Sequence, residues 1–158
     1  MTPAIPFKQT SKHFIIPENW KKNESAYTGD DLIDAFLQDK EAGRNETFRI
    51  LLAQLNSNIE KATSLSEKLY WEVLDKKIKA KSIHLKAEDL TKFRALFVVD
   101  KEDFLSEKFR DLYIIARCIK NESEDENFYL SFSFLPYSDK LSENSLNADG
   151  YFMKYEKK

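Results

Sequence analysis

One long stretch of this chain lacks the residues that interrupt helices. Neither glycine nor proline occurs from Arg44 to Leu135, and within it apolar or small residues recur at alternating spacings of four and three. This spacing places them near one line along a helix, so the line requires a partner surface. The stripe consists of Phe48, Leu52, Leu55, Ile59, Ala62, Ser66, Leu69 and Val73. It predicts one amphipathic helix to about Lys77, and some 30 residues at ~1.5 Å each would span about 45 Å.

The strongest strand pattern and a second helix follow. Residues 95–99 are apolar at every position, which indicates a strand covered on both faces. Asp100 is a suitable N-cap for a helix whose apolar positions recur as far as Ile119. Because apolar residues occupy more than half of its circumference, we expect this helix to be sandwiched, with Cys118 buried as an inert thiol.

Two further strands are predicted near the C-terminus. Residues 128–134 alternate apolar with polar side chains, which is typical of a strand with one buried face. A polar loop at 137–148 leads to an Asp-Gly turn and then to an aromatic strand at 151–155. This strand would complete the sheet.

The remaining segments give weaker signals. Residues 1–28 hold three of the four prolines and are expected to form an irregular arm that docks through its apolar cluster at 14–20. A short helix is expected at 30–43, a short strand around His84, and one helical turn at 87–93.

These elements predict an α+β fold with two layers. We expect a small mixed sheet of three or four strands, with the long amphipathic helix and the second helix packed on one face. The arm would cover residues 1–28, and residues 29–158 would form a single domain. A length of 158 residues and a 42% hydrophobic content suffice for one such core.

Composition favours a cytoplasmic protein. The formal net charge is −2 and the only cysteine is Cys118, so nothing suggests a polyanionic partner or a disulfide framework. No apolar run approaches the roughly 18 residues that span a bilayer, and we expect no membrane association.

Catalytic and metal-binding motifs are not apparent. The two histidines, His13 and His84, are too few and too scattered for a zinc site. The acidic run at 121–127 lacks the spacing of a calcium loop, and no phosphate-binding or nucleophile motif occurs. We therefore expect no cofactor and no metal, and favour a protein that is not an enzyme.

Charge is unevenly distributed along the chain. Residues 76–94 are rich in lysine, whereas residues 121–149 are acidic. The basic segment is explained by solvated cations near the end of the long helix, so nucleic acid is not expected as a partner. A salt titration of binding would test that option.

Two functional hypotheses follow. The first is a protein–protein interaction or scaffold module that self-associates, as a homo-oligomer, through its long helix, with an interface of Phe48, Leu52, Leu55, Ile59, Leu69 and Val73. The second is a small-molecule binding protein or an enzyme of a type without a recognised motif. Its cleft would lie on the sheet face that carries Tyr129, Ser131, Ser133, Tyr151 and Tyr155.

Overall fold

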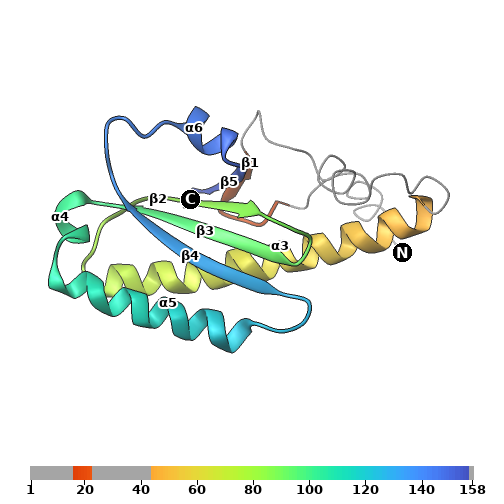
Figure 1. The fold of residues 1–158 in the computed structure, drawn as a ribbon, viewed down its shortest axis with the longest axis horizontal. Helices are drawn as coiled ribbons and strands as arrows, with labels where there is room; N and C mark the ends of the chain where they lie inside the picture. The colour runs from red at the N-terminus through yellow and green to blue at the C-terminus, as the bar shows by residue number, and fades with distance from the viewer. Residues whose placement is uncertain (1–15, 23–43, 157–158) are drawn as a thin grey trace.

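A bent sheet forms the frame of the molecule (Figure 1). The computed structural model describes residues 16–22 and 44–156. In these ranges the strands are β1 (Trp20–Lys22), β2 (Ala80–Ala87), β3 (Lys92–Val99), β4 (Tyr129–Pro136) and β5 (Tyr151–Tyr155). The helices are α3 (Arg44–Asp75), α4 (Lys101–Phe104), α5 (Arg110–Ser123) and α6 (Glu143–Ala148), with a 3₁₀ turn, η1, at Glu107–Phe109. The fold is therefore mixed α/β, as expected.

The sheet has five strands rather than the three or four predicted. Their order is β1-β5-β2-β3-β4, and neighbours are antiparallel except β3 and β4, which are parallel. The additional strand, β1, lies in the segment predicted as an irregular arm. Trp20 pairs with Tyr155, and its indole Nε1 donates to Glu67 Oε2 on α3 at 2.8 Å. The rest of the predicted arm and the helix expected at 30–43 lie outside the described residues.

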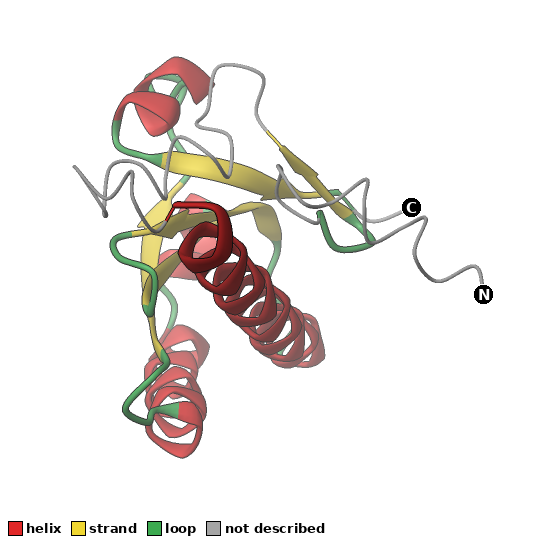
Figure 2. Cartoon of the chain, turned by 90° about the vertical axis from the view of Figure 1, so that its right-hand side faces the viewer, coloured by secondary structure: helices red, strands yellow, loops and turns green. Residues whose placement is uncertain are grey.

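Helix α3 packs against the sheet of its own chain. Figure 2 shows the sheet bending around one side of this helix, which contacts β2, β3 and α5. The stripe residues are 0–2% exposed, namely Leu52, Leu55, Ile59, Ala62, Ser66, Leu69 and Val73. The long helix is confirmed, but its stripe is buried within the chain and is not available there to a second copy. The Phe48 side chain lies outside the described part.

Strand β3 is covered on both faces, as predicted. Ala95, Phe97 and Val99 join the main core, whereas Leu96 and Val98 form a second cluster with Leu146 and Tyr151 on the other face. The helical turn predicted at 87–93 is wrong, because this segment instead closes the β2–β3 hairpin. Asp89 stabilises the turn by accepting the Leu90 backbone N–H at 2.6 Å.

The single helix predicted from Asp100 is broken into α4, η1 and α5. Asp100 makes no side-chain cap. The nearby Asp103 carboxylate instead accepts the Lys79 backbone N–H at 2.8 Å and lies 3.5 Å from Lys108 Nζ. These bonds tie α4 to the start of β2 and turn the chain before α5 begins.

Helix α5 is not sandwiched. Leu112, Ala116 and Ile119 are buried against the core, while Tyr113 is 48% exposed and Ile114 is 61% exposed. The expectation of a buried Cys118 is also wrong, because that thiol is exposed. The sheet offers α5 only one side to pack against, so part of its apolar circumference remains on the surface.

The other face of the sheet carries a helix that the sequence did not reveal. Residues 143–148, predicted within a polar loop, form α6, and the Ser142 hydroxyl caps it by accepting the Ser145 N–H at 3.1 Å. Leu146 is its only buried side chain among those described, and it covers Leu96 and Val98. Helices therefore lie on both faces, which corrects the predicted arrangement on one face.

Candidate functional site

The five residues of the predicted ligand face are not brought together. Strands β2 and β3 lie between β4, with Tyr129, Ser131 and Ser133, and β5, with the other two tyrosines. Tyr155 packs on the side of α3, with its ring centroid 5.2 Å from that of Tyr70. Tyr151 belongs to the cluster under α6. No single cleft joins them.

Both of those tyrosines have a raised pKa. Burial is the main cause at Tyr151, where the nearby Arg94 partly opposes it. Burial is again the first cause at Tyr155, assisted by Glu67. Both phenols therefore stay protonated at neutral pH and serve in packing.

Among the described residues, a groove with both apolar and cationic walls lies between β4 and α5, and we call it the β4–α5 groove. It has a volume of about 310 Å³, at the lower end of the range of ligand pockets, roughly 300–1,000 Å³. Its walls are Tyr113, Ala116, Arg117, Lys120, Asn121, Ser131, Phe132 and Phe134. Of the predicted site residues, only Ser131 lines it.

An aromatic cluster closes one end of the groove. The rings of Tyr113 and Phe134 are edge to face, with centroids 5.3 Å apart. Phe109 lies 5.1 Å from each of them, and Phe97 lies 5.7 Å from Phe134. Since Phe97 and Phe109 are buried, this end of the groove is apolar and fixed by the core.

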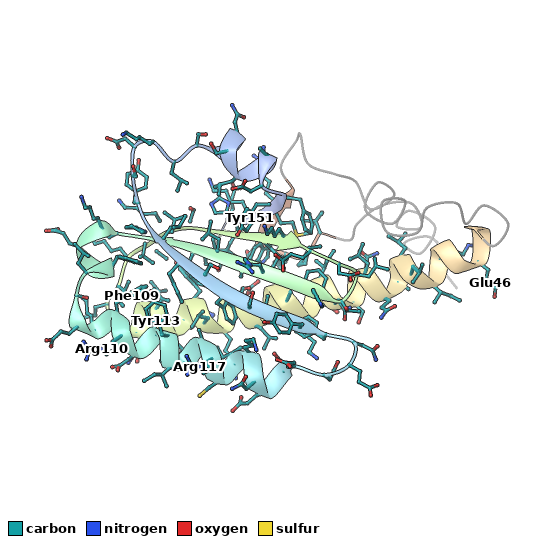
Figure 3. All side chains as sticks on the ribbon, in the orientation of Figure 1. Glu46, Phe109, Arg110, Tyr113, Arg117 and Tyr151 are labelled. Atoms are coloured by element: carbon teal, nitrogen blue, oxygen red, sulfur yellow. The ribbon has the colours of Figure 1, made fainter. Side chains whose placement is uncertain are left out.

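Two cationic side chains of α5, Arg117 and Lys120, line the rest of the groove. Figure 3 labels Tyr113 and Arg117 along this helix, with Arg110 at its start. Lys120 Nζ donates to Glu124 Oε1 at 2.9 Å and lies 4.6 Å from the Tyr129 ring centroid. The bond to Glu124 is the main reason that the pKa of Lys120 is raised, although burial opposes it.

Arg117 is electrostatically different from Lys120. Within the described ranges, neither the Arg117 guanidinium nor the Arg110 guanidinium has an ion pair or a hydrogen-bonded partner. Ser131 Oγ is buried and also has no hydrogen-bond partner among the described residues, but its side chain is in register with Arg94 and lies on the α6 face of the sheet, away from α5. The groove therefore combines an apolar end with a guanidinium that has no ionic partner among the described residues.

Among the described strands, β4 lies at one edge of the sheet, and no described strand pairs with its outer side. In a parallel pair, alternate residues of a strand bond to the neighbouring strand. The backbone N–H groups of Tyr129 and Tyr137 donate to Thr91 O at 2.8 Å and to Val99 O at 2.7 Å on the β3 side. The even-numbered residues between them point their backbone groups away from β3. Phe132 and Phe134 have no hydrogen-bond partner on that side within the described chain.

Sequence reasoning missed Tyr113, Arg117, Phe132 and Phe134. The phenylalanines were read as core residues, and they do pack on the core with one edge left open. The sequence does indicate that Arg117 lacks an ion pair within its helix, because no acidic residue lies three or four positions from it on α5. Lys120, in contrast, has Glu124 at that spacing.

The two histidines, which the sequence did not assign to a metal site, differ in whether the structure describes them. His84 is buried in β2 with Nε2 2.8 Å from Ser82 Oγ, and His13 lies outside the described residues. Among residues 16–22 and 44–156, no group of three or more His, Cys, Asp or Glu side chains is arranged to hold a metal ion. The helices in these ranges include none that is long and apolar enough to cross a bilayer.

Comparison with protein-family models, with curated proteins and with solved structures found no match. The fold defines the class, a mixed α/β protein, and its function must be inferred from the β4–α5 groove and the edge beside it.

Proposed function

We propose that this protein is a non-enzymatic interaction module that binds an extended segment of a partner protein along the free edge of β4. The observation that carries the proposal is the set of unpaired backbone groups at Phe132 and Phe134, beside a groove lined by side chains of α5. In this binding mode, main-chain hydrogen bonds supply affinity, and pockets for alternate side chains supply specificity.

The composition of β4 supports this proposal. Its residues Tyr129–Pro136 include no charged side chain, although natural edge strands are usually protected by lysines, bulges or covering segments. Pro136 ends the strand at an outward-facing position, where a missing N–H costs no bond to β3. At the opposite edge, two of the three described residues of β1 are lysines, Lys21 and Lys22. Of the two described edges, the one without charged side chains is therefore the one that a partner would cover.

The packing of the described residues bears on both hypotheses drawn from the sequence, the interaction module and the ligand cleft. An interaction module is retained, but the surface moves from the α3 stripe, whose described members are buried, to the β4 edge. A ligand cleft across Tyr129, Ser131, Ser133, Tyr151 and Tyr155 is not proposed, because β2 and β3 separate the two sets. A cytoplasmic location stays part of the proposal, supported by the single cysteine.

The test is a selection from a library of phage-displayed random peptides, followed by amide hydrogen exchange with a selected peptide. In the free protein, the Phe132 and Phe134 amides should exchange faster than those of Ser131 and Ser133, which bond to β3. Peptide binding should slow exchange at Phe132 and Phe134 specifically.

Two results would contradict strand addition. Uniform protection of all four amides in the free monomer would show that the edge is already paired. Selected peptides that bind without slowing exchange at Phe132 and Phe134 would show that they dock elsewhere. Protection that grows with protein concentration would identify a second copy as the occupant.

A further inference from the structure

We infer that the β4–α5 groove selects partner segments in which an acidic side chain lies two residues from a large apolar side chain. This inference rests on the proposed strand addition and specifies the chemistry of the partner. The apolar side chain would rest on Tyr113 and Phe134, and the carboxylate would bind Arg117.

The spacing of the two subsites matches an added strand. Alternate residues of a strand point to the same face and lie about 6.6 Å apart. Tyr113 and Arg117 are four residues apart on α5, or about 6 Å along the helix axis. One side chain of an extended segment can therefore lie over the Tyr113–Phe134 end while its second neighbour reaches Arg117.

The charges select an acid for the second position. Arg117 has no ionic partner within the described chain, whereas Glu124 already holds Lys120 at 2.9 Å. A carboxylate at Arg117 would form a charge-assisted hydrogen bond, which is stronger than a neutral one. A lysine there would instead meet two cations.

The same observation argues against a second copy of β4 as the occupant. The sequence of β4, YLSFSFLP, contains no acidic residue. A symmetric pairing of two β4 strands would therefore leave both Arg117 guanidinium groups without a carboxylate from the added strand. The partner that complements the groove is a different, acidic segment.

The experiment compares peptide selections on three proteins: wild type, Arg117→Glu and Arg110→Glu. Arg110 is the matched control, because it lies two turns away on the same helix, is also exposed, and does not line the groove. Wild type and Arg110→Glu should enrich peptides with an acid two residues from an aromatic or large aliphatic residue. Selection on Arg117→Glu should instead enrich peptides with lysine or arginine at the position of that acid. The consensus peptide should bind Arg117→Ala roughly tenfold more weakly than wild type.

The outcomes distinguish a failure of the charge selection at Arg117 from a failure of strand addition itself. Enriched peptides without an acid at this spacing, or the same consensus on wild type and Arg117→Glu, would overturn the charge selection and leave strand addition intact. A peptide that binds only through a free terminal carboxylate would overturn it too. The three proteins count as correctly folded if the melting temperatures of the variants match that of wild type. If no peptide is then enriched, the proposed function fails and this inference fails with it.

Discussion

Lys77 shows how one backbone conformation ends the longest helix. Its φ is 61°, in the left-handed region that favours glycine. The backbone N–H of Lys77 donates to Leu74 O at 2.9 Å, and that of Ile78 donates to Val73 O at 3.1 Å. These two bonds form a Schellman motif, whose left-handed position is usually glycine. The helix therefore stops without the residue that sequence rules look for.

Replacing Lys77 with glycine should stabilise the protein. Lys77→Gly removes the cost of the left-handed conformation, so we expect a gain of roughly 1 kcal/mol in urea unfolding. Lys68→Gly, in the exposed interior of α3, is the matched control and should lose roughly 1 kcal/mol. A loss in both variants would contradict the motif.

At the scale of elements, the α3 stripe is the main contribution of one helix to the core. Leu55 is 0% exposed and Ile50, on the same helix, is 60% exposed. Leu55→Ala should therefore destabilise the protein by roughly 2–5 kcal/mol through lost burial and a cavity. Ile50→Ala should change stability by less than about 0.5 kcal/mol. Thermal and urea unfolding measure both, and similar effects in the two variants would place the stripe away from the core.

The elements that sequence patterns predicted are those with a strong period. The stripe of α3 and the apolar run of β3 repeat over many residues, so both were found. Helix α6 was missed because Leu146 is its only buried position among those described, which leaves no periodic pattern. The break between α4 and α5 was missed because it depends on Asp103 binding the distant Lys79 N–H.

For the whole molecule, the packing predicts a monomer in the absence of a partner. The stripe is used within the chain, and β4 supplies no carboxylate for Arg117. Light scattering after gel filtration should give about 18.6 kDa at low and high salt and over a wide range of concentration. A dimer that survives high salt would restore self-association, and slowed exchange at Phe132 and Phe134 in that dimer would locate it at the β4 edge.

The sequence by itself determined the class of fold, the long helix and most strands, because periodicity and composition are local properties that one segment carries alone. It also determined that β4 has no charged residue. Only the tertiary structure decided what covers each apolar face. Strand pairing across the chain buried the stripe of α3 and separated β4 from β5. It also left the outer side of β4, beside Arg117, without a partner strand among the described residues. Local patterns do not specify these outcomes, because a residue's partners depend on the positions of distant segments.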